Sequence, residues 1–337
     1  MIDIRQIKNG YWWDAQGKFD SLIKGEEFLK ELTMQITDKC NLQCPKCNKT
    51  NFTFQDLPTE GALRIINEAC DLGLRHIHFT GGEPTLHQDF IDIVKLCTSK
   101  NLRIDMSSNG TFSKDYALAL DTAGMDSLNF SWDFLDKRPN CASFIDNPWK
   151  IKWFINHMVM PSNYLELPDF LKEIVNNPEY KNIIDIQLMP PRGTADKFSA
   201  DQVDQFNDSI ASKCFEIAKN RFPMIEAKIF EILSKDENGD APSGIYHIPL
   251  NFPCHRSRVE LRVGTKGFST CTYLYRDGKI FCDLNHSVKE AWGICKDQCS
   301  FNIPPVPHMC NFSCSPEVVN FNYFVEMEIR RDRKMDF

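Results

Sequence analysis

The residues best suited to chemistry in this chain are its cysteines. The sequence holds 14 cysteines in 337 residues, and they are unevenly placed. Three fall in the short run Cys40–Cys47 and seven in Cys254–Cys314. Clustered cysteines indicate metal ligands in a reducing compartment and disulfides in a secreted protein. The start Met1–Arg5 lacks the apolar core of a signal peptide, so we expect a cytoplasmic protein with metal ligands.

The first group consists of Cys40, Cys44 and Cys47, and three thiolates this close together can wrap one metal site. An iron–sulfur cubane has four irons, so three protein ligands leave one iron open to another molecule. A zinc site usually closes with a fourth Cys or His, and His76 and His78 are too distant in sequence to be obvious local ligands. From the residues alone, a zinc knuckle or a loop of free thiols stays an alternative.

The spacing C-x3-C-x2-C resembles the signature of the radical S-adenosylmethionine (SAM) superfamily. The resemblance implies a [4Fe–4S] cluster on Cys40, Cys44 and Cys47, with SAM chelating the open iron. In the family, one electron from the cluster cleaves SAM to methionine and a 5′-deoxyadenosyl radical, which abstracts hydrogen from the substrate. The protein mainly positions this chemistry. Lys46 departs from the aromatic residue that often precedes the third cysteine in the family.

Two further loops resemble SAM-binding loops of that family. Gly81-Gly82-Glu83-Pro84 matches the GGEP motif, which in relatives binds the amino group of SAM. In isolation, the same four residues also fit a tight turn with a capping acid. Ser107 and Asn109 lie in a loop similar to the family's TNG-type loop, for which an ordinary polar turn is the alternative.

The resemblance also suggests contacts at the ends of later strands. Ser131 and Asp133 end a predicted strand at a point where relatives contact the ribose or line the substrate pocket. Met189 ends a strand that flanks the adenine in the family, although a core position is the alternative.

The C-terminal cysteines form a second group. Two of them follow hairpin turns, and four form two close pairs with the spacing C-x3-C. The region resembles the SPASM or twitch extensions of radical SAM enzymes, which implies one or two auxiliary [4Fe–4S] clusters. A structural zinc site is the alternative. The candidate ligands are Cys254, Cys271, Cys282, Cys295, Cys299, Cys310 and Cys314.

These loops need a scaffold, and strands alternate with helices over most of the chain. We predict strands over 32–36, 76–80, 103–106, 127–131, 152–159 and 183–189, and helices over 59–72, 89–99, 114–123, 168–176 and 201–221. This alternation predicts an α/β fold, a partial (β/α)6 barrel with its chemistry at the carboxyl ends of the strands. Short strands and turns after residue 250 predict a small cysteine-rich extension with hairpins. The expected divisions are a leader segment (1–30), a radical SAM core (31–233), a linker (234–249), a SPASM/twitch-like domain (250–320) and a tail (321–337).

Net charge and hydropathy limit the classes of partner that we expect. The formal net charge is −7 without a basic run, and no segment has the length and hydropathy of a membrane span, so we expect neither nucleic acid nor membrane as a partner. The resemblance implies a flavodoxin or ferredoxin-type reductant and a small-molecule or peptide substrate. We expect a two-electron oxidation, a dehydrogenation assisted by an auxiliary cluster. Peptide epimerisation or crosslinking, and a non-catalytic iron–sulfur electron-transfer protein, are the alternatives.

Overall fold

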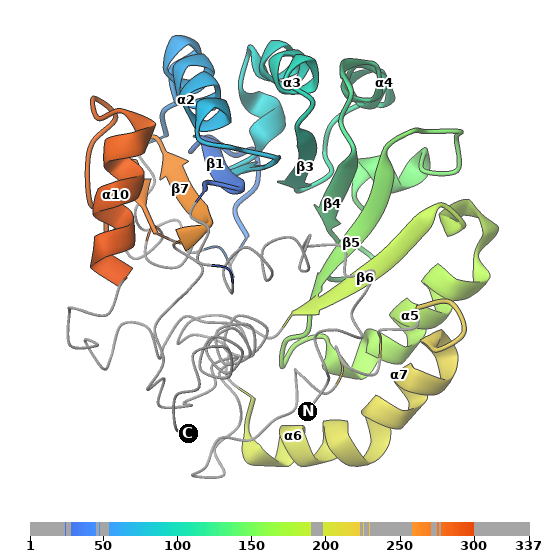
Figure 1. The fold of residues 1–337 in the computed structure, drawn as a ribbon. Coiled ribbons are helices and arrows are strands. Elements are labelled where there is room, and N and C mark those ends of the chain that lie inside the picture. Colours follow the sequence, from blue (N-terminus) through green and yellow to red (C-terminus); the bar gives the residue numbers. More distant parts are fainter. Residues whose placement is uncertain are drawn as a thin grey trace.

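The computed structural model describes residues 28–44, 47, 54–189, 198–222, 258–270 and 278–299, together with Lys24, Ile225, Ile229 and Tyr275. One curved sheet organises this part of the chain, with helices on its outer side (Figure 1). Six strands are parallel and follow the chain order across the sheet. They are β1 (Glu31–Thr37), β2 (His76–Gly81), β3 (Arg103–Ser108), β4 (Ser127–Ser131), β5 (Lys152–Met158) and β6 (Ile183–Met189).

All six strands lie where the sequence predicts them, and their ends differ by at most two residues. The sheet continues beyond β1 in the order β6-β5-β4-β3-β2-β1-β7-β8. Since β6 and β8 stand at opposite ends of that order, the sheet is an open arc rather than a closed cylinder. The predicted α/β fold with a partial barrel is therefore confirmed.

The helices pack on the convex side of the arc, between and beyond the strands (Figure 1). The predicted helix over 201–221 is a single run in which one π-helical turn interrupts two α-helical segments. The helices are α2 (Thr59–Asp71), α3 (Phe90–Ser99), α4 (Lys114–Ala123), α5 (Leu167–Asn176), α6 (Ala200–Gln205), α7 (Ala211–Ala218) and α10 (Val288–Cys299). Single helical turns lie at η2 (Pro84–Leu86), η3 (Asn140–Ser143), η4 (Tyr164–Glu166) and η5 (Pro178–Tyr180), and the π-helical turn is η6 (Phe206–Ile210).

The two faces of the sheet differ in polarity. Side chains that point to the helices are apolar and fully buried, among them Ile77, Phe79, Ile104, Met106 and Phe130. The alternate positions on the same strands are polar, namely His76, His78, Asp105, Ser107 and Asn129. Central parallel strands are usually apolar on both faces because helices cover both. The polar positions therefore mark the concave face as a surface with a role other than core packing.

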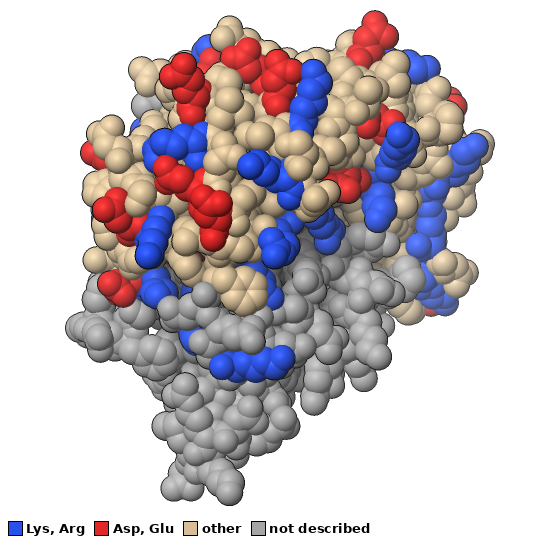
Figure 2. All heavy atoms as spheres, turned by 45° about the horizontal axis from the view of Figure 1, so that its top comes forward, with Lys and Arg blue, Asp and Glu red and all other residues tan. Residues whose placement is uncertain are grey.

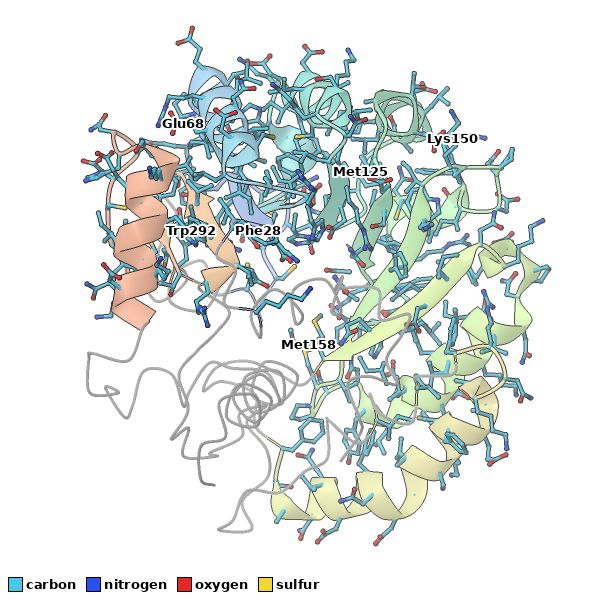
Figure 3. The ribbon with its side chains drawn as sticks, in the orientation of Figure 1. Phe28, Glu68, Met125, Lys150, Met158 and Trp292 are labelled. Atoms are coloured by element: carbon cyan, nitrogen blue, oxygen red, sulfur yellow. The ribbon has the colours of Figure 1, made fainter. Side chains whose placement is uncertain are left out.

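The segment after the predicted linker forms part of the same sheet. Strand β7 (Glu260–Gly264) pairs in parallel with β1, and β8 (Gly267–Ser269) returns from it as an antiparallel hairpin. The sequence predicts this hairpin but neither its partner strand nor helix α10. Trp292 of α10 is buried (Figure 3), and α10 packs beside α2 and β8.

The outer surface carries both signs of charge. Figure 2 shows Lys and Arg interspersed with Asp and Glu over the helix-covered side. Among the residues that the structure describes, no helix combines the length and the hydropathy that a membrane crossing requires.

Candidate active site

The cysteine loop begins directly at the carboxyl end of β1. Cys40 and Cys44 are half-buried and Cys47 is exposed. The loop turns back on itself, because the Cys47 amide donates to the Cys44 carbonyl at 3.0 Å. The Cys40 sulfur accepts hydrogen bonds from the Leu42 amide at 3.4 Å and from the Asn109 side chain at 3.8 Å. Two N–H groups thus point at this sulfur from different loops, a contact pattern that fits a metal-ligating cysteine.

Three soft thiol donors on one loop suit an iron–sulfur cluster. Among the described residues, no three Cys, His, Asp or Glu side chains already converge closely enough to hold a metal ion. The assignment of Cys40, Cys44 and Cys47 as ligands therefore rests on their spacing and on the contacts to Cys40, and it stays a prediction.

Polar contacts hold both ends of the cysteine loop. Asp56, beyond the loop, accepts hydrogen bonds from the Thr37 hydroxyl at 2.6 Å and the Lys39 ammonium at 2.7 Å. Burial alone would raise the pKa of Asp56, but the bonds from Lys39 and Thr37 outweigh it and lower the pKa. The loop is thus closed at its base by an ionised carboxylate.

Gly81 and Gly82 bring the second loop into contact with the first. The Gly82 amide donates to the Thr37 carbonyl at 2.8 Å, and the Glu83 amide donates to the Lys39 carbonyl at 2.7 Å. A Cβ at Gly81 would lie 2.4 Å from the Thr37 carbonyl oxygen, and one at Gly82 only 2.0 Å from that of Lys39. Glycine is therefore required at both positions for the backbones to approach.

Glu83 links the second loop to the third. Its buried carboxylate accepts the Asn109 amide at 2.7 Å, the Ser108 hydroxyl at 2.8 Å and the Thr85 hydroxyl at 2.8 Å. Burial raises the pKa of Glu83, although hydrogen bonds from these three residues oppose the shift. Pro84 begins the 3₁₀ turn that follows, and it is buried. In this geometry Glu83 holds the third loop in place, and the predicted contact to the amino group of SAM stays a prediction.

The third loop, which follows β3, is hydrogen-bonded to the cysteine loop. Asn109 donates from its side-chain amide to Asn41 at 2.8 Å, and Asn41 donates to the Thr111 hydroxyl at 2.8 Å. Gly110 lies in the left-handed region with φ +72°, and a Cβ there would meet the sulfur of Cys141 at 2.7 Å. The loops after β1, β2 and β3 thus form one hydrogen-bonded unit around Cys40.

This unit lies inside the segment that matches a known family. The sequence model of the radical SAM superfamily matches residues 34–190, which contain all three loops. The chain carries a radical SAM domain. Proteins of this superfamily use a [4Fe–4S] cluster and SAM.

Comparison with curated proteins agrees with this assignment. The chain is similar to a probable GTP 3′,8-cyclase of Methanothermobacter marburgensis, with 33% identity over 35% of this chain and 39% of that protein. It thus spans about two fifths of that relative's length. It is also similar to a tungsten-containing aldehyde ferredoxin oxidoreductase cofactor-modifying protein of Pyrococcus furiosus, with 26% identity over 62% of this chain and 67% of that protein.

Two solved structures share the fold at low sequence identity. The chain superimposes on Streptococcus suis SuiB bound to its precursor peptide SuiA with a TM-score of 0.61 and 15% identity, covering 89% of this chain and 75% of that one. It superimposes on anSMEcpe with bound AdoMet and Cp18Cys peptide with a TM-score of 0.59 and 14% identity, covering 89% and 95%.

The other predicted contacts of the radical SAM domain lie at the rim formed by β4, β5 and β6. Ser131 is exposed at the end of β4. Asp133 accepts the Met158 amide at 2.8 Å, which fastens the loop after β4 to the end of β5. Met189, half-buried, stands in register with Met158, which Figure 3 places at the carboxyl end of β5. Their predicted roles with SAM stay predictions.

The structure adds Asn156, which the sequence reasoning missed. It lies on β5 in register with Ser131 of β4 and Gln187 of β6. Its side-chain oxygen is buried and has no hydrogen-bond partner within the part of the chain that the structure describes. A buried acceptor without a partner is costly unless a ligand or water satisfies it, so Asn156 fits a ligand-facing position.

A polar network on the concave face was also missed. Asp105 accepts from both His76 and His78, His76 contacts Glu31 at 3.3 Å, and the Ser107 hydroxyl lies 3.2 Å from His78. Burial alone would lower the pKa of His76, but the two carboxylates raise it to about 10. The alternation of polar with apolar residues in β2 and β3 is the signal that could have revealed this network.

In the extension, two predicted ligands come together. Cys282 and Cys295 are both buried and their side chains form a hydrogen bond. Burial raises the pKa of both thiols. Cys299 ends α10, and its side chain lies outside the described residues, as do Cys254, Cys271, Cys310 and Cys314.

Proposed function

We propose that this protein is a radical SAM enzyme whose [4Fe–4S] cluster is held by Cys40, Cys44 and Cys47. The observation that supports this most is the unit of three loops at the ends of β1, β2 and β3, which is hydrogen-bonded around Cys40. When bound and reduced, the cluster supplies the electron that cleaves SAM to methionine and a 5′-deoxyadenosyl radical. The residues of the chain then have the tasks of holding SAM, placing the substrate and excluding water.

Residues beyond the cluster loop are proposed to hold SAM. Gly81, Gly82, Glu83 and Pro84 provide a rigid loop beside the cysteines, and Ser107 and Asn109 provide polar groups on the next strand end. Ser131, Asp133 and Met189 belong to the opposite rim, where the unsatisfied oxygen of Asn156 offers an acceptor to a polar ligand. We propose that SAM and the substrate lie between these two rims, where both sides offer polar groups.

We propose a two-electron oxidation as the reaction. It would need an acceptor for a second electron, and an auxiliary cluster in a SPASM/twitch-like extension would provide one. The adjacent thiols of Cys282 and Cys295 support such a site, because two of the predicted ligands meet although they are separated in sequence. A structural zinc site remains the alternative for the same cysteines.

The substrate class stays open between a small molecule and a peptide. Two similar proteins, a GTP cyclase and a cofactor-modifying protein, favour a small-molecule substrate. Two similar structures contain bound peptides and favour a peptide substrate. Peptide epimerisation or crosslinking is therefore the second candidate reaction. Mass spectrometry separates epimerisation from the two oxidations, because dehydrogenation and crosslinking each remove two hydrogens, whereas epimerisation in D2O adds one deuterium. Fragmentation of the product then distinguishes a crosslink from a dehydrogenated residue.

The test is anaerobic reconstitution followed by measurement of iron, zinc and 5′-deoxyadenosine under reduction by dithionite or a flavodoxin or ferredoxin system. We expect roughly eight to twelve irons per chain and 5′-deoxyadenosine formation, since each cluster contributes about four irons. The variant C40A/C44A/C47A should lose about four irons and all 5′-deoxyadenosine. The variant C282A/C295A should lose about four irons and keep the SAM cluster.

A matched control is C214A, because Cys214 is a buried thiol on α7 outside both groups. It should keep the full iron content. Iron binding without 5′-deoxyadenosine would favour an electron-transfer protein over an enzyme. Zinc in place of iron at Cys282 and Cys295 would refute the auxiliary cluster, and a redox-neutral reaction would become the better hypothesis.

A further inference from the structure

The hairpin β7–β8 packs against the strand that leads into the cysteine loop. Residues 260–263 of β7 pair in register with residues 31–34 of β1. The hairpin turn, Thr265-Lys266, therefore stands beside the carboxyl end of β1, where the loop toward Cys40 begins.

Asp38 accepts a hydrogen bond from this hairpin. It is 1% exposed and lies two residues before Cys40. One carboxylate oxygen accepts the Gln35 side-chain amide at 2.5 Å, and the other accepts the Thr265 hydroxyl at 2.8 Å. The Asp38 backbone amide donates to the Gln55 carbonyl at 2.8 Å, so this residue is fixed from three directions.

Arg262 fixes the orientation of Gln35. Arg262 is 2% exposed, and its guanidinium donates to the Gln35 side-chain oxygen at 3.0 Å, which turns the amide nitrogen of Gln35 toward Asp38. The same guanidinium lies 5.1 Å from the ring centre of Tyr275, whose hydroxyl accepts the Lys266 amide at 3.2 Å. Two separate contacts thus run from the hairpin to Asp38, one direct and one through Gln35.

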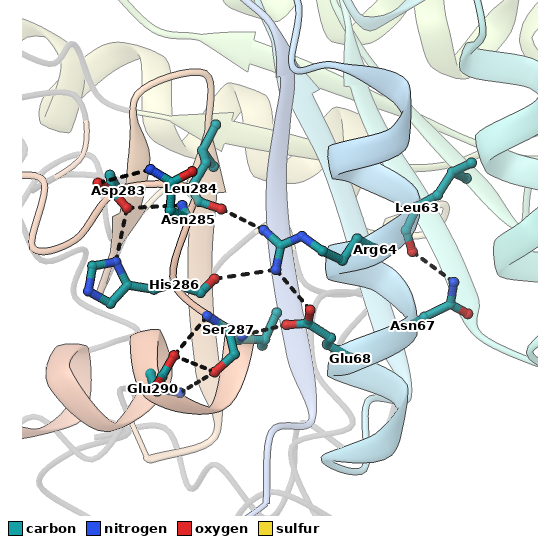
Figure 4. A network of polar contacts seen from close by, with 11 residues as sticks. Leu63, Arg64, Asn67, Glu68, Asp283, Leu284, Asn285, His286, Ser287 and Glu290 are labelled. Carbon is teal, nitrogen blue, oxygen red and sulfur yellow. Dashed lines mark hydrogen bonds and ion pairs between the residues drawn. The ribbon is translucent and has the colours of Figure 1, made fainter.

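The hairpin is in turn joined to the cysteine-rich extension. The Phe268 amide of β8 donates to the Cys282 carbonyl at 2.9 Å. Arg64 of α2 donates to the Leu284 carbonyl at 2.5 Å, and Glu68 accepts the Val288 amide at 2.7 Å (Figure 4). The hairpin therefore bridges the cysteine loop and a segment that is docked firmly on the radical SAM domain.

We propose that Thr265 and Arg262 are positioning residues for the SAM cluster: through Asp38 and Gln35 they set the geometry of the loop that carries Cys40. The inference rests on the proposed function, because it takes Cys40 as a cluster ligand. It assigns the extension a role in SAM cleavage itself, separate from any auxiliary cluster.

The test uses Thr265→Val, which keeps the shape of the side chain and removes its hydroxyl, and Thr265→Ser, which keeps the hydroxyl. The first readout is the alkylation rate of Cys40, Cys44 and Cys47 in the cluster-free full chain, followed by peptide mass spectrometry. A hydrogen bond to a buried carboxylate is strong, so Thr265→Val should raise the alkylation rates of the half-buried Cys40 and Cys44 about tenfold, and Thr265→Ser should keep them near the wild-type rates. Buried Cys214 is the internal control, because its alkylation reports global unfolding.

The second readout is the change in the electron paramagnetic resonance spectrum of the reduced, reconstituted chain on titration with SAM. We expect Thr265→Val to bind wild-type amounts of iron and to weaken SAM binding about tenfold, with Thr265→Ser close to wild type. Wild-type alkylation rates and SAM affinity in Thr265→Val would overturn the inference. If the wild type itself shows no SAM-dependent change, the proposed function fails instead.

If Thr265→Val raises Cys214 alkylation as well, the variant is globally destabilised and Arg262→Lys takes its place. The shorter reach of the lysine to Gln35 should then raise the alkylation of Cys40 and Cys44 while Cys214 stays protected. Wild-type alkylation rates of Cys40 and Cys44 in Arg262→Lys would also refute the positioning role.

Discussion

Replacing Glu83 by Gln tests whether this carboxylate is the link between the loops. Both of its oxygens face backbone N–H donors, Thr85 at 3.3 Å and Asn109 at 2.7 Å. These two donors cannot reorient, in contrast to the hydroxyls that also contact Glu83. An amide in place of the carboxylate must therefore direct its own N–H groups at one of them.

The cost follows from the contacts. One charge-assisted hydrogen bond worth about 1.5–3 kcal/mol is lost, and a buried donor is left unsatisfied at a further cost of about 1–3 kcal/mol. We expect Glu83→Gln to lower the free energy of unfolding by ~4 kcal/mol. After reconstitution, it should also lower 5′-deoxyadenosine formation, because the loops after β2 and β3 separate.

Urea denaturation of the cluster-free chain measures the first effect without any cofactor. Asp92→Asn is the matched control, because this carboxylate is 73% exposed and its pair with Lys95 is on the surface. That change should alter the free energy of unfolding by less than about 0.5 kcal/mol. A Glu83→Gln variant within about 1 kcal/mol of the wild type would show that Glu83 does not hold the loops together.

Three further changes follow from contacts described above. Gly82→Ala places a Cβ against the Lys39 carbonyl oxygen, so we expect a loss of about 2 kcal/mol or more in urea denaturation and incomplete iron loading; normal loading would contradict the close approach. His76, with its pKa raised to about 10, contributes stability that is fully present below its unfolded-state pKa near 6.5 and is lost as pH rises through about 10. The stability difference between wild type and His76→Gln should therefore shrink between pH 6.5 and 10, and a constant difference would refute the ionised network. Glu68→Ala removes the acceptor of the Val288 amide at the start of α10, so hydrogen exchange of α10 should accelerate about tenfold while the central strands stay protected.

The strands and the cysteine loop could be predicted from the sequence because their signals are local. Each of the six strands is a short apolar or alternating run between a helix and a loop, and Cys40, Cys44 and Cys47 are close in the chain. The family resemblance added the Gly81–Pro84 and Ser107–Asn109 loops, and the structure shows why they belong together: Glu83 and Asn109 connect them. Gly81 and Gly82 also allow close contact with the backbone at Thr37 and Lys39, which the sequence did not indicate.

What could not be predicted depends on contacts between distant parts of the chain. The sequence around Glu260 contains no signal that β7 pairs with β1, which lies more than 200 residues earlier. Asp38 and Asp56 resemble ordinary loop acids until the fold brings Thr265 and Lys39 to them. The His76–Asp105 network was visible only as polar residues in strands, and assigning it required the register between β2 and β3.

The pairing of β7 with β1 has a consequence for how the chain can be divided. The edge of β1 that faces away from β2 is covered only because the C-terminal hairpin supplies β7. A fragment ending before residue 258 would expose a row of backbone N–H and C=O groups along β1, and such an open edge can pair with strands of other chains. We therefore expect the matched segment 34–190, produced alone, to aggregate, and a longer segment that includes β7 to stay dispersed.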